Sequence, residues 1–167
     1  LLSLPPAAGP GGNFSLHFPC LQLHQRDRGN INSNSSDKLS GNLSRAIGDL
    51  TQLRVLLLAF NGFSGELPLE IGQLSLLEIL DLSFNSFHGP IPPTLQNCSS
   101  LRLINLSGNQ FNGTIPAFFG QSPGFQVVSL SFNLLSGSVP EEFGDNCVSL
   151  EHILLAANSL TGSIPPS

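Results

Sequence analysis

A repeat of about 24 residues constrains this chain more than any other feature of its sequence. An asparagine that follows an L-x-L pattern recurs at Asn61, Asn85, Asn109, Asn133 and Asn158, so the successive spacings are 24, 24, 24 and 25. Five full units begin at Leu50, Leu74, Cys98, Ser122 and Cys147, after a partial unit that holds Leu39, Gly41 and Leu43 in register. The extra residue of the long unit falls at Asn146. A fixed period of this length indicates stacked units that share one core.

Each position of the period has a physical role. The alternating leucines of two successive units are expected to point inward from short parallel strands, namely Leu53, Leu56 and Leu58 beside Leu77, Leu80 and Leu82. The asparagine that follows turns the chain out of the sheet, and its side-chain amide bonds backbone groups of the turn. We therefore expect an internal asparagine ladder and not a ligand site.

A glycine and a proline complete each unit. Four positions after the asparagine, a tight bend favours a residue without Cβ at Gly65, Gly89, Gly113, Gly137 and Gly162. An apolar residue and a proline follow, at 67–68, 91–92, 115–116, 139–140 and 164–165. Because proline fixes φ and lacks a donor, this stretch should be extended and lie at an edge or in a loop.

These units resemble the plant extracellular leucine-rich repeat, LxxLxxLxLxxNxLSGxIPxxLGxL. The resemblance covers Leu39 to Ser167, and the SG-x-IP element is typical of plant receptor kinases, receptor-like proteins and polygalacturonase inhibitors. The runs NLSRAIGDLTQLRVLLLAFNGFSGELP and FGDNCVSLEHILL are similar to the first repeats of the receptor-like protein kinase 2 type. The resemblance implies an α/β repeat solenoid, a leucine-rich repeat horseshoe or superhelix with a parallel concave sheet and short 3-10 or helical turns.

Two regions are expected along the chain. Residues 1–37 form an N-terminal segment, an incomplete or degenerate cap, because they contain no Trp and only Cys20 where the family usually has a W-x-G-V-x-C stretch and paired cysteines. Residues 38–167 hold about six repeats, the last one truncated at Ser167. Since terminal repeats need polar caps, we expect a fragment of a longer array.

Composition argues against several partner classes. The net charge is −5, with six Lys and Arg that all lie at or before Arg102, so no basic stripe exists for nucleic acid. The acids of the last third are interpreted as a solvated face: Glu141, Glu142, Asp145 and Glu151. The longest apolar run, Val55 to Phe60, has the length of a strand and not of a membrane span.

Six N-x-S/T sequons predict a secreted glycoprotein, at Asn13, Asn34, Asn42, Asn97, Asn105 and Asn112. Of these, Asn97 and Asn112 should lie on connecting segments. Asn105 instead falls on the predicted sheet face, where a glycan would obstruct binding. Either this sequon is unused or the face does not bind.

No catalytic group, metal site or cofactor is predicted. The cysteines lack C-x-x-C spacing, and Cys98 and Cys147, two units apart, should be about 10 Å from each other, beyond the reach of a disulfide. We expect free, buried thiols at both. The histidines at 17, 24, 88 and 152 are scattered, no G-x-S-x-G elbow accompanies them, and surface roles account for His88 and His152.

The expected recognition surface is the concave sheet face, read from strand residues whose side chains point away from the core. These residues are Val55, Leu57, Ala59, Ile79, Asp81, Ser83, Leu103, Asn105, Ser107, Val127, Ser129, Ser131, His152, Leu154 and Ala156. Their character is mildly apolar with a single acid. Phenylalanines recur just before the repeat asparagine, at Phe60, Phe84 and Phe132, and form either a stacked aromatic edge or part of the core or side packing.

Three functional readings follow. The first is a part of the ectodomain of a plant receptor-like serine/threonine kinase that binds a protein or peptide ligand, or a co-receptor. It would lie on the extracellular side of the plasma membrane. The second is a secreted interaction protein of the polygalacturonase-inhibitor kind, without a kinase. The third is a truncated product without activity, which would fold poorly because both solenoid ends expose apolar core.

Overall fold

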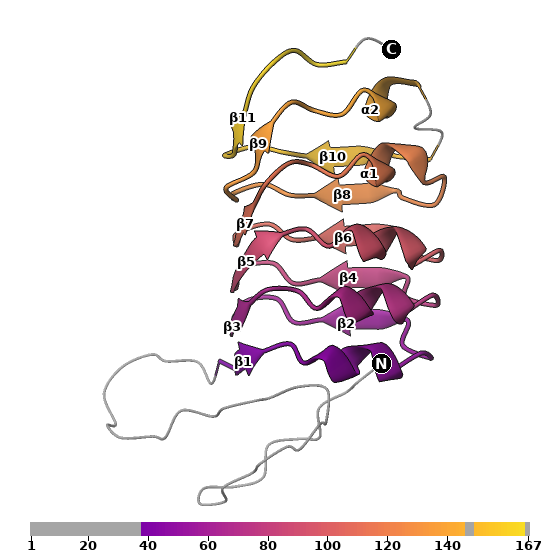
Figure 1. Ribbon diagram of the computed structural model, residues 1–167, viewed down its shortest axis with the longest axis vertical. Coiled ribbons are helices and arrows are strands. Elements are labelled where there is room, and N and C mark those ends of the chain that lie inside the picture. The colour runs from indigo at the N-terminus through magenta and orange to yellow at the C-terminus, as the bar shows by residue number, and fades with distance from the viewer. Residues whose placement is uncertain (1–37, 146–148, 166–167) are drawn as a thin grey trace, which may run out of the picture.

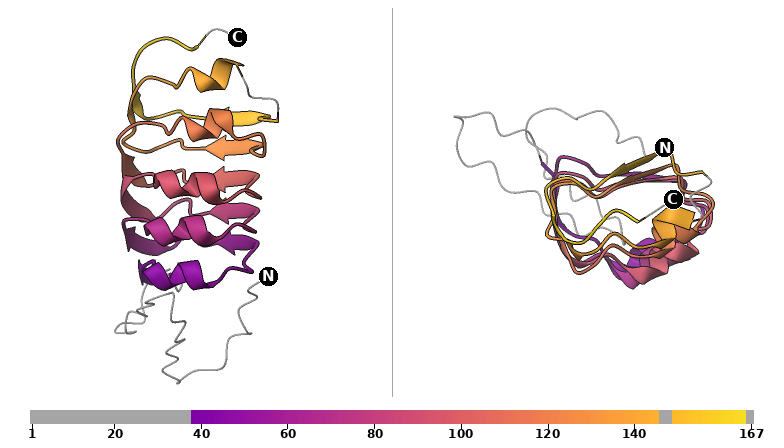
Figure 2. Two further views of the ribbon diagram at one scale, coloured as in Figure 1. Left: turned by 45° about the vertical axis from the view of Figure 1, so that its right-hand side comes forward. Right: turned by 90° about the horizontal axis from the view of Figure 1, so that it is seen from above.

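The chain winds into a solenoid of stacked coils (Figure 1), in a computed structural model that describes residues 38–145 and 149–165. Each complete coil contributes a strand, a turn, a second strand and a helical turn. Seen along the stack, the coils superpose in one outline with the helical turns gathered at one corner (Figure 2). The predictions on residues 1–37, with Cys20, Asn13 and Asn34, and on Cys147 fall outside the described residues.

One parallel sheet runs the length of the stack and forms the concave face. Its five strands are β2 (Val55–Leu57), β4 (Ile79–Asp81), β6 (Leu103–Asn105), β8 (Val127–Ser129) and β10 (His152–Leu154), in the order β10-β8-β6-β4-β2. Val55 pairs with Ile79, and Ile79 with Leu103, so each strand lies one repeat from the next. The predicted parallel sheet of a leucine-rich repeat solenoid is confirmed.

A second parallel sheet follows the repeat asparagines. Its strands are β1 (Ser40–Asn42), β3 (Gly62–Gly65), β5 (Ser86–Pro90) and β7 (Gln110–Asn112), and a separate pair is formed by β9 (Ser136–Gly137) and β11 (Ser159–Leu160). An isolated bridge between Thr114 and Ser136 joins the two parts. The glycines of the predicted bend have positive φ, for example +86° at Gly65 and +81° at Gly89, a conformation that favours a residue without Cβ. The sequence pattern does not predict this second sheet, because the extended stretch that it predicts, the apolar residue and proline of each unit, lies after these strands.

Short helical turns cover the opposite side. They are η1 (Arg45–Asp49), η2 (Leu69–Gln73), η3 (Pro93–Asn97), α1 (Phe118–Gln121) and α2 (Glu142–Asp145). The prolines before two of these turns are extended, as predicted, with ψ of 141° at Pro68 and 126° at Pro92. None of the helices in the described ranges has the length and apolar character that a bilayer crossing requires.

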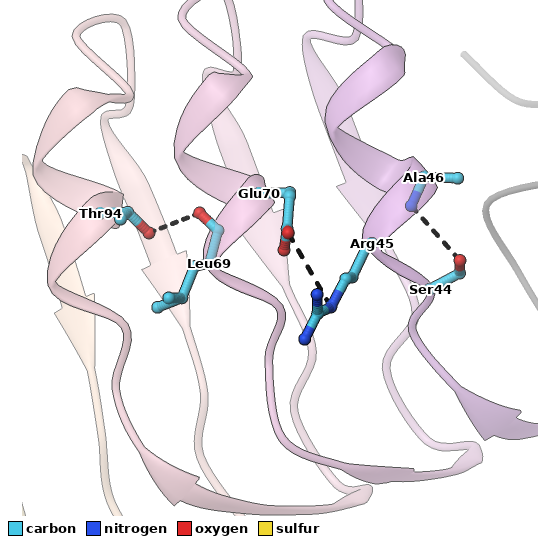
Figure 3. A network of polar contacts seen from close by, with 6 residues as sticks. All are labelled: Ser44, Arg45, Ala46, Leu69, Glu70 and Thr94. Atoms are coloured by element: carbon cyan, nitrogen blue, oxygen red, sulfur yellow. Dashed lines mark hydrogen bonds and ion pairs between the residues drawn. The ribbon is translucent and has the colours of Figure 1, made fainter.

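Polar contacts hold neighbouring helical turns together (Figure 3). The Thr94 hydroxyl donates a hydrogen bond of 2.7 Å to the Leu69 carbonyl of the preceding coil. The Nε of Arg45 lies 3.9 Å from the Oε1 of Glu70, in the next coil. Close approach also requires glycine, because a Cβ at Gly72 would overlap the Thr94 carbonyl oxygen. These side chains are used to stack the coils.

The core between the sheets and the helical turns is apolar and continuous. Leu56, Leu80, Ile104 and Val128 point inward from successive concave strands and are buried. A second column consists of phenylalanines, with ring centroids 6.2 Å apart for Phe63 and Phe87 and 6.3 Å for Phe87 and Phe111. Among the predicted inward leucines, Leu53 and Leu58 are only partly buried at the start of the stack but pack against this core.

The repeat asparagines form the ladder that the sequence predicts. The Asn85 amide donates to the Leu82 and Ser83 carbonyls of its own coil and to the Leu58 carbonyl of the preceding coil. Its Oδ1 accepts the backbone N–H of Phe63 at 3.0 Å. Bonds to both coils recur at Asn109, Asn133 and Asn158. Each asparagine therefore joins two coils through buried backbone groups.

The long unit keeps this ladder intact. Val127 pairs with Leu103 on one side and with His152 on the other, and the step to His152 is longer by one position. The Asn158 Oδ1 still accepts the Leu135 N–H at 3.0 Å. In the second sheet, the step from Ser136 to Ser159 is also longer by one position than the step from Ser40 to Gly62. The extra residue therefore lies in the part of the chain that both long steps include, between β9 and β10. The predicted position, Asn146, is in this interval but outside the described residues.

Candidate functional site

The concave sheet arranges the predicted recognition residues in three columns, each with one residue per coil. The first is mostly apolar and half-buried: Val55, Ile79, Leu103 and Val127, ending in the exposed His152. The second contains the exposed residues Leu57 and Leu154, the half-buried Asp81 and Asn105, and Ser129. The third contains Ala59, Ser83, Ser107, Ser131 and Ala156. The first two columns thus lie within the strands of one sheet, and the third lies just beyond the ends of these strands.

Four serines in these columns are buried, which corrects our expectation that their side chains are accessible. Ser83 is 2% exposed, and Ser107, Ser129 and Ser131 are also buried. Parallel strands are only about 4.8 Å apart, so larger neighbours close over a short side chain. The hydroxyls of Ser107 and Ser129 are satisfied internally, since they share a hydrogen bond at 2.7 Å between their Oγ atoms. These four residues offer a ligand no accessible side chain.

The accessible part of the concave face is apolar with few charges. Leu57 is 63% exposed and is paired in register with Asp81 on the next strand. Arg54 and Glu78, which precede the strands, form an ion pair with 2.6 Å between Nη1 and Oε1. Such an exposed pair contributes little stability, about 0.2 to 1 kcal/mol, but it neutralises this border of the face.

Asp81 is the one acid within the three columns. Its Oδ1 accepts hydrogen bonds from the Ser83 backbone N–H at 3.0 Å and from the Ser83 hydroxyl at 2.6 Å. Among the described residues, the ion pairs are those of Arg45 with Glu70 and Arg54 with Glu78, and neither includes Asp81. The carboxylate is held in a fixed position by donors that carry no charge.

An exposed aromatic edge borders the concave sheet on the side of the second sheet. Phe60 and Phe84 are 65% and 47% exposed, and their rings stack with centroids 4.5 Å apart and planes 10° from parallel. Phe132 is also exposed. Of the two alternatives in the sequence, the stacked edge is therefore correct for Phe60 and Phe84, while none of the three phenylalanines belongs to the core.

The backbone of this edge is left-handed at all three phenylalanines, a property that the sequence does not reveal. The φ angles are +58° at Phe60, +53° at Phe84 and +56° at Phe132. The left-handed conformation costs a residue with a Cβ about 1 to 2 kcal/mol. Gly108 occupies the equivalent position between Phe84 and Phe132, with φ of +68°. The fold itself therefore accepts a glycine at this position, without any ring.

The described sequons lie on three different sides of the solenoid. Asn42 and Asn112 are exposed on the second sheet, and Asn97 is exposed at the end of η3. Asn105 is half-buried within β6, where its Oδ1 accepts the Ser107 N–H at 3.2 Å. The conflict between a glycan at Asn105 and binding on the concave face is thus real in the folded chain. Use of any of these sequons remains a prediction.

Reactive groups are sparse in the described residues. His88 and His152 are exposed and lie on different strands, β5 and β10. Within the described ranges, no group of His, Cys, Asp and Glu is arranged to hold a metal ion. Cys98 is free and buried, as predicted, and burial raises the pKa of its thiol to about 11. At neutral pH this thiol is protonated and a poor nucleophile.

An open apolar cleft of about 330 Å³ lies at the C-terminal end of the stack, between β10 and the segment after β11. Its lining includes Phe143, Leu150, Leu155 and Ile164. These residues occupy positions that interior coils bury against the following coil. The cleft is therefore an exposed section of the core.

The matches to known proteins agree with this geometry. The Leucine Rich Repeat family matches residues 52–74, 76–98, 100–122 and 124–146. Each matched segment begins near the end of a helical turn and includes one concave strand and one ladder asparagine. Among curated protein sequences, none matches with significance.

Solved structures with the same fold include receptor ectodomains. The chain is 37% identical to the PEPR1 chain in the PEPR1–AtPEP1 complex, with a TM-score of 0.74, and the match covers 77% of this chain and 18% of that one. It is 40% identical to the GASSHO1/SCHENGEN3 ectodomain of Arabidopsis thaliana in complex with CASPARIAN STRIP INTEGRITY FACTOR 2, with a TM-score of 0.73, covering 77% and 15%.

A shorter ectodomain also matches. The SOBIR1 receptor kinase ectodomain of Arabidopsis thaliana is 33% identical, with a TM-score of 0.71, and the match covers 78% of this chain and 70% of that one. The chain spans less than a fifth of the PEPR1 and GASSHO1 structures. It is thus comparable to a few coils of a long receptor solenoid or to most of a short one.

Proposed function

Because this chain belongs to the leucine-rich repeat family, in its plant extracellular form, we propose that it is a recognition part of the ectodomain of a plant receptor-like serine/threonine kinase. Its coils bind a protein or peptide ligand, or a co-receptor, on the concave face. The concave face is accessible at Leu57, Asp81 and Leu154, and it combines apolar side chains with a single acid. The observation that carries this proposal is the likeness to ectodomains solved with their ligands.

The segment itself recognises and does not catalyse. Family members with this fold are typically non-catalytic, and the kinase activity of a receptor resides in a separate domain. The face is accessible and mostly uncharged, so shape and apolar contact supply most of the affinity, with Asp81 adding orientation. Nucleic acid is a poor partner for a chain of net charge −5 without clustered Lys and Arg.

We place the protein on the extracellular side of the plasma membrane, as part of a receptor. The matched ectodomains are consistent with an extracellular location, and three described sequons lie at exposed positions, Asn42, Asn97 and Asn112. We further propose that the leucine-rich repeats begin at residue 38. The secreted, inhibitor-like alternative shares the fold but is less favoured, because the matches reported above are receptor ectodomains.

A binding experiment with the whole chain tests the concave-face proposal. Short peptides are selected from a random displayed library against the purified protein, and their Kd is measured by calorimetry. Charge insertion on the face, by Leu57→Glu or Leu154→Glu, should weaken binding at least tenfold because each replaces an exposed apolar contact by a charge. Gln96→Glu, at an exposed position of η3 on the helical side, is the matched control and should bind normally. The proposal would be refuted if all three variants lost the same affinity, or if the Kd of the peptides were unchanged by Leu57→Glu and Leu154→Glu.

A further inference from the structure

A compact surface in the first coils combines apolar exposure with an acid. We call Leu57, Phe60, Asp81 and Phe84 the Phe60–Phe84 patch. Leu57 and Asp81 pair in register on β2 and β4, and the Phe60 N–H donates to the Ser83 carbonyl next to Phe84. The three apolar members are among the exposed large hydrophobic residues of the chain. The patch therefore continues from the concave sheet onto the aromatic edge.

The rings of this patch are not required by the fold. Both phenylalanines have left-handed backbone, where glycine or asparagine is preferred, and Gly108 fills the same position one coil later. The same left-handed backbone recurs at Phe132 and Ala157, so the turn of the repeat sets this conformation whatever side chain is present. The stack thus has the properties of a binding feature more than those of a packing feature.

The geometry of the stack selects the chemistry of the occupant. Two ring faces are turned onto each other at 4.5 Å, and the far side of Phe84 lies over Gly108, whose added Cβ would be 2.7 Å from the ring. The exposed part of Phe84 is therefore the ring edge. Ring edges carry partial positive charge and prefer the face of another aromatic ring. A sugar stacks on an open ring face, and neither face of Phe84 is open.

The second feature of the patch that a ligand can recognise is the negative charge of Asp81. The carboxylate of Asp81 is fixed by Ser83 and has no cation in the ion pairs of the described residues. It lies three positions before Phe84 along the chain, a separation of at most about 10 Å between the two Cα atoms. A basic side chain placed near an aromatic one in the same ligand segment would complement both groups.

We propose that the Phe60–Phe84 patch docks a protein segment that presents an aromatic side chain to the ring edges and a basic side chain to Asp81. The inference rests on the proposed recognition function and specifies the ligand chemistry of that face. It assigns part of the recognition surface to the aromatic edge, outside the three columns of the sheet.

The test uses the whole chain and the selected peptides as probes. The double variant Phe60→Asn/Phe84→Asn should weaken their binding at least tenfold, and Asp81→Asn should weaken it about three- to tenfold, more at low salt than at high salt. The selected peptides should contain an aromatic residue within four positions of Lys or Arg. Because asparagine tolerates left-handed backbone, the melting temperature of the double variant should be unchanged or higher.

Phe132→Asn is the matched control, since Phe132 has the same backbone conformation and is exposed but belongs to a different coil. It should leave binding unchanged. If the double variant binds normally while Leu154→Glu does not, the patch is refuted and concave recognition stands. A large fall in melting temperature with the double variant would instead assign the rings a packing role and overturn the proposal.

A titration with carbohydrate tests the alternative that the patch binds a sugar. Soluble pectin oligosaccharides are titrated into the chain and into the double variant by calorimetry. Absence of binding agrees with a protein segment as the occupant. Binding of the oligosaccharides that disappears in the double variant would overturn the choice of a protein segment.

Discussion

An interior coil and the last described coil have the same pattern of residues but very different burial. Leu80, which points inward from β4, is 0% exposed, whereas Ile153, its equivalent on β10, is 37% exposed. Ile91 is buried after the second-sheet strand of its coil, whereas the equivalent Ile164 is 88% exposed. The chemistry of the side chains is matched, so the difference arises only from the neighbouring coil.

This comparison shows where the stability of the array resides. A coil buries its apolar residues against the next coil, and its strand hydrogen-bonds on both edges only when it lies between two neighbours. Each unit is thus stabilised mainly by its interfaces. Substitutions at equivalent positions should reveal this difference directly, with large effects inside the stack and small effects at its end.

The largest difference is expected for truncation of the inward leucine. Leu80→Ala removes a fully buried side chain and leaves a cavity between two coils, so the free energy of unfolding should fall by about 3 to 4 kcal/mol. Ile153→Ala removes a partly exposed side chain and should cost about 1 kcal/mol. Urea unfolding followed by circular dichroism measures both. Equal losses would mean that the terminal coil is as well packed as the interior.

The ladder asparagines should show a smaller difference. Asn109 is buried and bonds the Phe87 N–H and the Leu82 and Leu106 carbonyls, so Asn109→Ala leaves these groups unsatisfied and should cost about 2 to 3 kcal/mol. Asn158 makes the same kinds of bond but is only half-buried, so water replaces it and Asn158→Ala should cost about 1 kcal/mol.

Asn112→Ala, an exposed asparagine measured in unglycosylated protein, provides the baseline for this pair and should change the unfolding free energy by less than about 0.5 kcal/mol. A loss at Asn158 that equals the loss at Asn109 would contradict the role of burial in the ladder.

A pH-dependent difference is expected for the thiol of an interior coil. The pKa of Cys98 is raised from 9.0 to about 11 by burial, so the folded chain keeps a proton that the unfolded chain releases. The stabilisation from this thiol is complete below pH 9 and is lost as pH rises through 11. In the Cys20→Ser/Cys147→Ser background, the free energy of unfolding should fall more steeply between pH 9 and 11 than when Cys98→Ala is added. If the free energy of unfolding had the same pH dependence with and without Cys98→Ala, burial would not raise the pKa of this thiol.

Much of the solenoid could be predicted because the repeat multiplies each signal. The bend glycines, the prolines and the ladder asparagines recur at one spacing, and all adopt the conformation or bonds that their chemistry indicates. The second sheet could not be predicted, because its strands pair only between coils. Nothing within the S-G stretch of one unit distinguishes a paired strand from a free loop.

The candidate site could be predicted only in outline. The alternation of the strand identifies which residues face the concave side, but not that a serine such as Ser83 is covered by its neighbours. The aromatic edge is visible in the sequence only as a column of phenylalanines. Its left-handed backbone and the overlap of Phe60 with Phe84 depend on the turn geometry, which side-chain identity does not specify.

The long unit shows where the length of a repeat can change, by evolution or by protein engineering, without disturbing the solenoid. Its extra residue enters between β9 and β10, while both sheets and the asparagine ladder keep their register. Length can therefore vary on the side of the helical turns without a shift of any side chain on the concave face. A loop, a tag or a small domain grafted after Gly137 and before His152 should leave the recognition surface unaltered.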